Sequence, residues 1–425
     1  MWKQLPADGS DTSYTSTDVQ YVIDGGALLH RIPWNNGETY DTICSHYTRY
    51  VSEKYNRQAV IVFDGYESGP STKYVAHGKR AKSSTTVPVH FTKDMICSMK
   101  KDELLSSTAN KQRFINLLSD NFEQKGYKVL HADADADLLM VQTAIKSGDT
   151  RTTVLVGDDT DLLVLLLNQA CQPKCDIFFR PEPKLNSKKT PRCWNIKPVQ
   201  GTLGKKVCDN LPFAHAILGC DTTSRVFGIG KPVALKKLVS SEYFRQQAAV
   251  YCNTGSTKND VEVAGENALV CLYNGKPGER LDVQRHQRFC QKVSSSTSSI
   301  HPRGLPPTSS AAKYHSHRVY HQVQQWNGTD MNAEEWGWKI NNDRMCPVHT
   351  DMKPAPAALL EAVNCNCKSD CSTRRCSCRK YGLDCSAACG ECKGLHCTNV
   401  TLLDQEIDSD DDIVPTMITD CRTQD

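Results

Sequence analysis

The sequence of 425 residues has no long hydrophobic run, because its longest unbroken apolar stretch is the six residues at positions 162–167. A helix that crosses a membrane needs about 20 apolar residues, so we expect no transmembrane segment. The first residues also lack the apolar core of about 7 to 15 residues that marks a secretory signal. We therefore expect an intracellular protein.

The sequence also lacks a strong excess of charge of one sign, since 51 Lys and Arg residues nearly balance 48 Asp and Glu residues. With 39% hydrophobic and 23% charged residues, the composition excludes both a polycationic chain and wholesale disorder. Contacts with nucleic acid must therefore be local. The length suits one large domain with a small one, or two to three modest domains.

Cysteine is abundant, with 21 residues. In a reducing compartment, metal ligation or buried thiols are favoured over disulfides. Eleven cysteines are scattered from Cys44 to Cys346, nine crowd between Cys365 and Cys397, and Cys421 stands alone. The scattered cysteines predict thiols in a core, whereas the crowded ones predict a metal site.

From residue 19 to about residue 239, short apolar runs alternate with helical patterns. The predicted strands are residues 19–23, 60–63, 127–130 and 153–156. The predicted helices lie at about residues 72–81, 111–124, 138–147, 161–168, 212–219, 231–239 and 242–252. This alternation predicts an α/β domain with a largely parallel central sheet flanked by helices.

Seven aspartates follow the predicted strands or open the helices after them. They are Asp24, Asp64, Asp135, Asp137, Asp159, Asp161 and Asp221. The carboxyl ends of parallel strands meet at one edge of a sheet, so we expect these side chains to converge. Carboxylates that converge need cations, and hard oxygen ligands suit Mg²⁺ or Mn²⁺. For any single one of these residues, a helix N-cap or a turn is the simpler interpretation.

Two such ions about 4 Å apart form a phosphodiester-hydrolysis site, in which one activates water and the other stabilises the leaving oxygen. Two further features suit a nucleic-acid substrate. The turn Gly228-Ile229-Gly230 before Lys231 exposes backbone amides to an anion, here a duplex phosphate. The stretch of residues 73–113 contains nine Lys and Arg residues, including Lys79, Arg80 and Lys82, but only three acidic residues. This stretch is either a phosphate-attracting segment or a solvated basic face.

The order of these motifs resembles that of the flap-endonuclease superfamily of structure-specific 5′-nucleases, which have a PIN-like fold. The resemblance covers about residues 18–245 and rests on Asp24, Phe63-Asp64-Gly65, Asp135-Ala136-Asp137, Asp159-Thr160-Asp161, Gly219-Cys220-Asp221 and Gly228-Ile229-Gly230. It implies that the seven aspartates are the metal ligands and that the basic stretch forms an arch over a threaded strand. It also implies that residues 213–240 form a helix-three-turn-helix, which binds duplex DNA with the help of a potassium ion.

In one departure from the family, Asp135 and Asp137 stand where two Glu residues are usual. Each side chain is thereby shorter by one methylene group, which changes the spacing of the metal ligands. The repeated Asp133-Ala134-Asp135-Ala136-Asp137 also permits a register shift by two. We expect Asp135 and Asp137 in the site because Asp137 leads directly into a helix, and the shift would put Asp133 in place of Asp135.

The crowded cysteines form a module of their own, at residues 365–400. They are Cys365, Cys367, Cys371, Cys376, Cys378, Cys385, Cys389, Cys392 and Cys397. Nine thiolates are too few for three separate four-cysteine sites, so a cluster of three zinc ions with three bridging sulfurs satisfies tetrahedral coordination. The segment has few apolar residues, so metal binding would also supply its folding free energy.

This module resembles the tesmin-like CXC domain, which ends in Cys-x-Asn as Cys397-Thr398-Asn399 does here. Domains of that type bind DNA, which implies phosphate or minor-groove contacts for the basic residues around Cys376. These are Arg374, Arg375, Arg379 and Lys380. The spacing of the last three cysteines is looser than usual there. The whole arrangement resembles animal proteins associated with transposable elements.

These patterns predict five regions along the chain. They are a nuclease domain at residues 18–290, a Ser-, Thr- and Pro-rich linker at 291–310, a helical and Trp-rich connector at 311–364, the zinc module at 365–400 and an acidic disordered tail at 401–425. The leading hypothesis is a nuclear, divalent-metal-dependent nuclease that cleaves DNA near junctions of single-stranded and duplex segments. The alternatives are an inactive PIN-like protein that binds DNA through the zinc module, and an RNA nuclease.

Overall fold

The structure is a computed structural model. It describes residues 18–65, 72, 87–171, 173–182, 192–295, 302–342, 344–352, 364–368, 370–386, 389–395 and 397–400. The chain forms two compact units, Met1–Asp351 and Met352–Asp425. The helix predicted at residues 72–81, the basic residues Lys79, Arg80 and Lys82, and the tail predicted at residues 401–425 lie outside the described residues, apart from residue 72.

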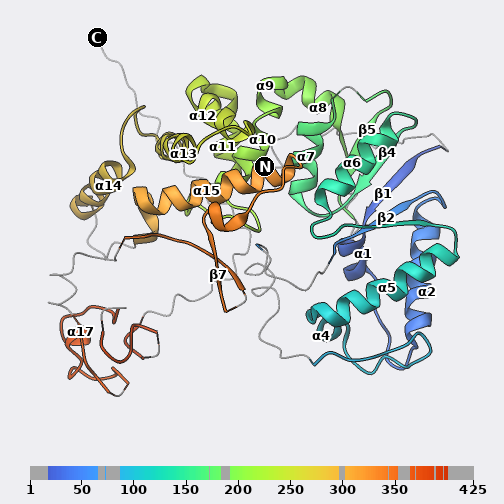
Figure 1. The fold of residues 1–425 in the computed structure, drawn as a ribbon, viewed down its shortest axis with the longest axis horizontal. Coiled ribbons are helices and arrows are strands. Elements are labelled where there is room, and N and C mark those ends of the chain that lie inside the picture. The colour runs from blue at the N-terminus through green and yellow to red at the C-terminus, as the bar shows by residue number, and fades with distance from the viewer. Residues whose placement is uncertain are drawn as a thin grey trace, which may run out of the picture. The chain divides into compact units, whose positions relative to one another are not determined.

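A six-stranded sheet forms the centre of the first unit (Figure 1). Its strands are β1 (Gln20–Asp24), β2 (Val60–Phe63), β3 (Lys128–His131), β4 (Thr153–Val156), β5 (Ile177–Arg180) and β6 (Trp194–Asn195). Their order is β3-β2-β1-β4-β5-β6, and all neighbours are parallel except β6, which is antiparallel to β5. The predicted α/β class with a largely parallel sheet is confirmed. The four predicted strands agree with β1 to β4 within one residue.

Both faces of the sheet are covered, as is usual for parallel strands. Successive residues of a strand point to opposite faces, and the neighbours Val22 and Ile23 of β1 accordingly belong to different cores. Helices α1 (Gly25–Arg31), α2 (Tyr40–Lys54) and α5 (Thr108–Gln124) cover the face of Ile23. Helices α6 (Asp137–Gly148) and α7 (Thr160–Gln169) cover the face of Val22 (Figure 1).

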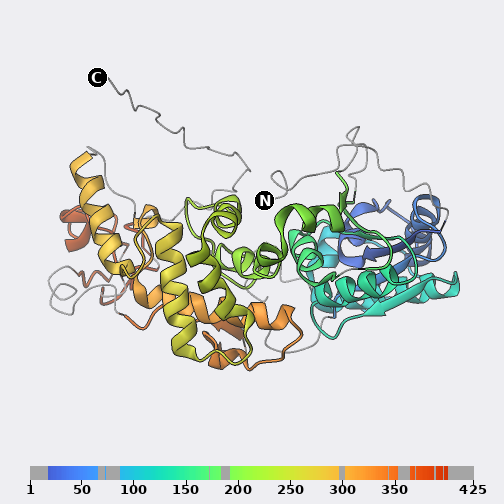
Figure 2. The same ribbon diagram turned by 90° about the horizontal axis from the view of Figure 1, so that it is seen from above.

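The rest of the first unit is mainly helical. Its elements are α4 (Lys101–Ser106), α8 (Ile196–Leu203), α9 (Lys205–Cys208), α10 (Leu211–Ile217), α11 (Lys231–Ser240), α12 (Glu242–Cys252), α13 (Lys258–Leu272), α14 (Leu281–Ser295), η2 (Pro302–Gly304), α15 (Ser309–Trp326), η3 (Ala333–Glu335), β7 (Trp338–Asn341) and β8 (Arg344–Pro347). Helix α15 packs against α10 and α13 (Figures 1 and 2). The predicted linker thus overlaps the end of α14 and the start of α15.

Helix α15 is polar in sequence and yet buried. Several of its polar side chains form hydrogen bonds with the segments around it. The imidazole of His315 donates to the carbonyl oxygen of Ile217 over 2.8 Å, and the amide of Gln324 donates to that of Tyr251 over 2.8 Å. The hydroxyl of Thr222 donates to Gln322. Such contacts offset the cost of burying polar groups and bind α15 firmly to the helices that follow the sheet.

Burial of His315 makes the first unit sensitive to acid. Desolvation, helped by the charge of Arg318, lowers the pKa of His315 to about 4. The unfolded chain therefore binds a proton near pH 6.5 that the folded chain takes up only near pH 4. As the pH falls through this window, His315 should remove about 3 kcal/mol from the free energy of unfolding. The variant His315→Gln should lose this part of the pH dependence, as measured by urea unfolding between pH 4 and 7.

The matched control is His286→Gln on α14, since His286 is exposed. It should keep the pH dependence of the unmodified protein. Equal pH dependence in His315→Gln and the unmodified protein would contradict the prediction.

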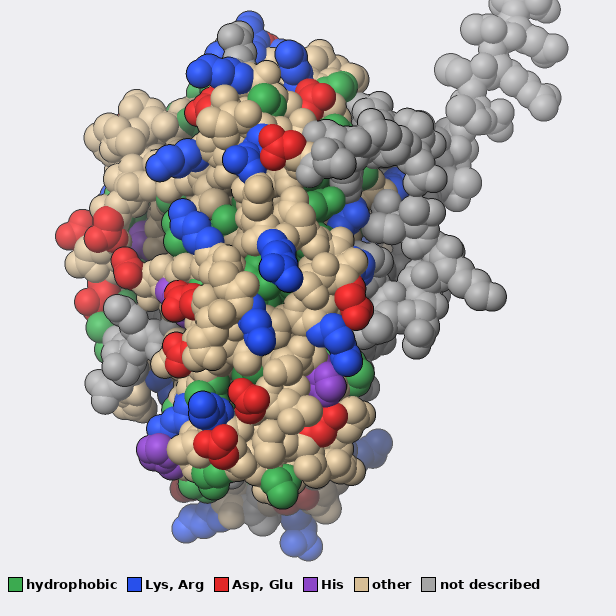
Figure 3. Space-filling view, turned by 90° about the vertical axis from the view of Figure 1, so that its right-hand side faces the viewer, with side chains coloured by type: hydrophobic (Ala, Val, Ile, Leu, Met, Phe, Trp, Pro, Cys, Tyr) green, Lys and Arg blue, Asp and Glu red, His purple; other side chains and the backbone are tan. Residues whose placement is uncertain are grey.

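On the face at the α2 and α5 end of the sheet, positive and negative side chains are interspersed (Figure 3). This agrees with the nearly balanced composition, so a nucleic-acid site on the protein would have to be local. Within the described parts of the chain, none of the helices has the length and apolar character that a membrane span requires.

The second unit contains the short helix α17 (Ser377–Lys380). Its buried core consists of cysteine side chains, against which Val400 packs. The buried ones are Cys365, Cys371, Cys376, Cys378, Cys385, Cys389 and Cys392.

Candidate active site and cysteine cluster

The strand order of the sheet changes direction between β1 and β4. From β1 the chain moves outward through β2 to β3, and then returns to β4 on the other side of β1. At such a switch point, the connections leave in opposite directions and open a crevice outside the carboxyl ends of the strands, which is where ligands bind in open α/β sheets. Asp24 ends β1, Asp64 follows β2 directly, and Asp159 follows β4 by three residues. The topology thus places these carboxylates at one edge.

Asp24 and Asp64 form the centre of a first carboxylate group. Asp24 caps helix α1, where its Oδ1 accepts from the amide of Ala27 over 3.0 Å. Close approach is possible because Gly26 has no side chain. A Cβ atom there would lie 3.1 Å from Oδ1 of Asp24 and 3.6 Å from Oδ2 of Asp64. The two carboxylates therefore border the same small space.

Asp64 links this group to the start of helix α6. Its Oδ1 accepts from the backbone amide of Ala136 over 3.1 Å, which lies between Asp135 and Asp137. Asp137 is 8% exposed, Asp135 is half-buried and Asp133 is exposed. This placement favours Asp135 and Asp137 over Asp133 as members of the site.

The carboxyl of Asp24 is costly to ionise in this position. Desolvation raises its pKa to about 7, and the charges of Asp64 and Asp158 act in the same direction, against the lowering effect of the Ala27 amide. Near neutral pH, a proton or a cation is therefore needed to neutralise the group.

Asp159, Asp161 and Asp221 form a second carboxylate group on the other side of the switch point. Asp159 caps α7, where it accepts from the amide of Asp161 over 3.0 Å. Desolvation raises the pKa of Asp159 to about 7, and the charges of Asp161 and Asp221 raise it further against the effect of this hydrogen bond. The group is thus a second place where positive charge is needed.

Asp161 also contacts His215, a residue outside the group of carboxylates, and His215 in turn contacts Lys231. Oδ1 of Asp161 lies 2.5 Å from Nε2 of His215 on α10, and the same nitrogen lies 2.6 Å from Nζ of Lys231. Sequence reasoning did not identify His215, because its partners lie on α7 and α11, far away along the chain.

The seven aspartates do not form one compact cluster. Among the described residues, the sets of three or more ligand atoms that lie within 4.8 Å of one another consist of cysteines. The carboxylates instead form two groups, and the backbone that leads to the second group passes Asp24, since a Cβ atom at Gly157 would lie 3.3 Å from Cβ of Asp24. Oxygen ligands gathered in this way suit hard divalent cations.

Two basic side chains that sequence reasoning did not identify lie at the end of helix α1, the helix that Asp24 caps. Arg31 forms an ion pair with Asp158, and Asp158 is one of the charges that act on Asp24. Lys101 donates to the carbonyl oxygen of Ile32 over 2.8 Å, and desolvation lowers its pKa to about 8. Lys101 belongs to the basic stretch of residues 73–113, but nothing in its sequence context distinguishes it from the other lysines there.

The glycine turn precedes helix α11, as the sequence predicts. Gly228 has a positive φ of 73°, which favours glycine, and both Gly228 and Gly230 are exposed. Phe227 beside them is 59% exposed, and the guanidinium of Arg303 lies 5.8 Å from its ring centre. The turn is therefore accessible to a ligand, whereas the side chain of Lys231 points to His215.

The sulfur atoms of the second unit have the spacing of a metal cluster. The Sγ atom of Cys365 lies 3.8 Å from the Sγ atoms of Cys371 and Cys385. The Sγ atoms of Cys376 and Cys385 are 3.7 Å apart, and those of Cys378 and Cys389 are 3.5 Å apart. A disulfide bond is about 2.05 Å long. With Zn–S bonds of about 2.3 Å, by contrast, the edge of a tetrahedral zinc site is about 3.8 Å. These cysteines are thus close enough together to serve as ligands of shared metal ions.

Three overlapping sets of four cysteines could each hold an ion. They are Cys365, Cys376, Cys378 and Cys385; Cys365, Cys371, Cys385 and Cys392; and Cys365, Cys367, Cys371 and Cys376. The overlap means that some sulfurs would serve two ions. Cys389, which these sets do not include, has its sulfur 3.5 Å from that of Cys378, and Cys397 packs against the buried cysteines.

The basic residues of this unit differ in their solvent exposure and in their hydrogen bonds. Arg374, Arg375 and Lys380 are exposed, as a nucleic-acid contact requires. Arg379 is half-buried, and its guanidinium donates to the carbonyl oxygens of Cys371 over 2.7 Å and Thr398 over 2.9 Å. Arg379 thus holds the two ends of the module together.

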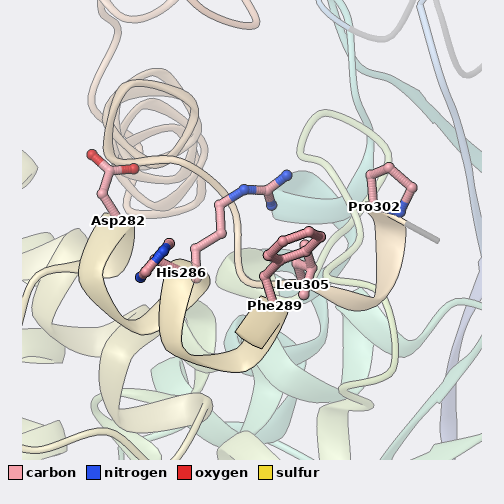
Figure 4. Close-up of a pocket in the computed structure, with 6 residues that line it drawn as sticks. Asp282, His286, Phe289, Pro302 and Leu305 are labelled. Carbon is pink, nitrogen blue, oxygen red and sulfur yellow. The ribbon is translucent and has the colours of Figure 1, made fainter. Parts of the chain in front are cut away.

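A pocket of about 350 Å³ lies elsewhere in the first unit, and none of the seven aspartates lines it. Phe289 of α14 faces Leu305 and Pro302 there (Figure 4). Asp282, Arg285 and His286 complete its lining, so the pocket is separate from the two carboxylate groups.

The fold of the chain is similar to that of several solved nucleases. One is the catalytic core of Rad2 in complex with a DNA substrate, at 12% identity over 66% of this chain and 68% of that chain, with a TM-score of 0.35. A second is the bacteriophage T5 flap endonuclease with DNA and metal ions, at 14% identity over 73% and 90%, with a TM-score of 0.36. A third is human GEN1 with Holliday junction DNA, at 12% identity over 79% and 84%, with a TM-score of 0.34.

No model of a protein family matches the sequence, and no curated protein matches it. Because the identities to the solved nucleases are low, we derive the chemistry of the site from its own residues.

Proposed function

We propose that the first unit is a divalent-metal-dependent nuclease, which hydrolyses phosphodiester bonds of DNA near junctions of single-stranded and duplex segments. The observation that carries this proposal is the pair of carboxylate groups at the switch point between β1 and β4. In each group, one carboxyl has a pKa raised to about 7. Helix capping by Asp24 and Asp159 does not by itself explain why carboxylates that repel one another gather at this edge of the sheet, whereas binding of cations does.

Each carboxylate group would hold one divalent cation. The proposed ligands are Asp24, Asp64, Asp135 and Asp137 for one ion, and Asp159, Asp161 and Asp221 for the other. When bound, the ions would supply Lewis acidity toward a phosphodiester. The protein's own residues then position the substrate: Arg31 and Lys101 attract the phosphate, and the turn at Gly228 and Gly230 contacts a duplex backbone with its amides.

For the second unit, we propose a cluster of three zinc ions on the nine cysteines that binds DNA. The sulfur spacing supports the ions, and the exposed Arg374, Arg375 and Lys380 supply contacts to phosphate.

The test is cleavage of labelled 5′-flap, hairpin, single-stranded DNA and RNA substrates with Mg²⁺ or Mn²⁺. We expect metal-dependent cutting of the junction substrates. The double variant Asp159→Asn, Asp161→Asn should reduce the rate by at least about 100-fold, because it removes charged ligands of one ion. Asp209→Asn is the matched control, because Asp209 pairs with Lys205 at the surface over 2.9 Å, and it should cleave normally.

The other outcomes distinguish the alternatives. Cutting of RNA alone would assign an RNA nuclease. Binding of DNA without cutting, unchanged in the double variant, would contradict the enzyme and leave the cysteine module as the functional centre.

A further inference from the structure

The side chain of Lys231 has an inward position that a phosphate contact does not explain. It is the first residue of α11 and follows the exposed glycine turn, so the sequence predicts an ammonium group that faces DNA. Instead, its Nζ lies 2.6 Å from Nε2 of His215. That nitrogen lies 2.5 Å from Oδ1 of Asp161, whose side chain is 12% exposed, and the side chain of His215 is completely buried. The three groups are in contact in this order, and the single nitrogen Nε2 hydrogen-bonds either to Asp161 or to Lys231 at any one time.

An ammonium group loses hydration in this position. Desolvation lowers the pKa of Lys231, and the charge of Asp161 opposes this effect. A desolvated cation is stable only beside compensating negative charge. The second carboxylate group thus holds Lys231, and Lys231 in turn offsets part of the negative charge of that group.

The chain of contacts also joins three separate elements. Asp161 lies on α7, directly after the edge of the sheet, His215 lies on α10, and Lys231 begins α11 after the glycine turn. The turn that is open to a duplex backbone is thereby connected, through two side chains, to a carboxylate of the proposed metal site. Displacement of the turn would therefore move Lys231 relative to Asp161.

We propose that Lys231 is a positioning residue: through His215, it fixes Asp161, offsets the charge of the second carboxylate group and couples the glycine turn to the metal site. This inference rests on the proposed function, since it assumes that the second group binds a divalent cation. It assigns Lys231 a role different from that of a lysine that contacts phosphate directly.

The test measures Mn²⁺ affinity by titration without DNA, and duplex DNA affinity as a function of salt concentration. A positive charge close to a cation site weakens binding of the cation by Coulomb repulsion. Lys231→Met should therefore bind Mn²⁺ about tenfold more tightly than the unmodified protein. Its DNA affinity should keep the same salt dependence, because no phosphate contact is lost. In cleavage, kcat should fall while KM for DNA stays the same.

Three further variants separate charge from packing. Lys231→Gln also removes the charge but retains a hydrogen-bond donor, so it should give the same gain in Mn²⁺ affinity, even if the Met variant does not fold. Lys231→Arg retains the charge and should bind Mn²⁺ with the same affinity as the unmodified protein. Lys236→Met removes an exposed lysine of the same helix, and its Mn²⁺ affinity should not change because solvent screens that charge.

Two results would overturn the inference in distinguishable ways. If Lys231→Gln bound Mn²⁺ as the unmodified protein does and the logarithmic salt slope of DNA binding fell by about one, Lys231 would be a phosphate contact. If the unmodified protein bound no Mn²⁺ at all, the metal site would be wrong, and the proposed function would fail together with the inference.

Discussion

Removal of zinc is expected to unfold residues 365–400 and to leave the sheet of the first unit folded. The buried core of the second unit consists of cysteine side chains, and sulfurs 3.5 to 3.8 Å apart are bonded to one another neither covalently nor by strong hydrogen bonds. Without ions, this core has almost no apolar surface to hold it together. Structural zinc supplies about 10–16 kcal/mol of folding free energy in small modules at pH 7, which makes this the largest effect that we expect.

Hydrogen exchange of the full-length chain, with and without a strong chelator, measures this effect for each segment. Protection should be lost in residues 365–400 and kept in β1 and β4. Metal analysis should find about three zinc ions per chain. Cys365→Ser should lower the zinc content, because Cys365 belongs to all three sets of four cysteines. Cys290→Ser, which changes an exposed thiol of α14, should leave it unchanged.

A chelator that left protection in residues 365–400 intact would contradict the zinc cluster. So would a preparation without metal in which the cysteines are stably oxidised to disulfides.

The variant Asp24→Asn is expected to abolish cleavage and, at the same time, to stabilise the metal-free protein. Its amide cannot replace a charged ligand, so cleavage should fall by about 100- to 1000-fold. Stability should change in the opposite direction because the folded protein disfavours the ionised Asp24, whose pKa is raised to about 7 from 3.8. The neutral carboxyl favours the folded state fully below pH 3.8, and this contribution is lost as the pH rises through 7.

The measurement is the free energy of unfolding of the metal-free protein between pH 4 and pH 8. Ionisation of Asp24 should lower the free energy of unfolding by on the order of 4 kcal/mol over this range. The variant Asp24→Asn should not show this decrease. Addition of Mn²⁺ at pH 8 should restore stability to the unmodified protein by mass action, and much less to the variant. Asp94→Asn, which changes an exposed carboxylate, is the control for stability and cleavage. Full cleavage by Asp24→Asn would exclude Asp24 from the site.

The central sheet could be predicted because each of its first four strands is a short apolar run after which polar residues follow. Strand β5 was missed because three apolar residues, Ile177 to Phe179, do not distinguish a strand from any other buried segment. They form a strand because β4 lies beside them. The burial of α15 could not be predicted either, because His315 and Gln324 are residue types that are common at the surface. Their burial depends on partners on α10 and α12.

The candidate site could be predicted only as far as topology determines it. An aspartate after a parallel strand must lie at the carboxyl edge, whatever its side chain does, and this is true of Asp24, Asp64 and Asp159. The division of the carboxylates into two groups depends on side-chain directions, which the sequence does not specify. The inward position of Lys231 depends on contacts among α7, α10 and α11, and a lysine after a glycine turn suits an outward position equally well.

The packing of α15 affects how the chain emerges from the ribosome. Gln322 accepts a hydrogen bond from Thr222, a residue that the ribosome incorporates 100 residues earlier. At about 5–20 residues per second, translation needs about 5 to 20 s to complete that stretch. During this time, the side of α10 that bears His215 and Ile217 has no α15 to cover it. The nascent protein therefore passes through a period in which chaperones that bind exposed apolar segments have a defined target.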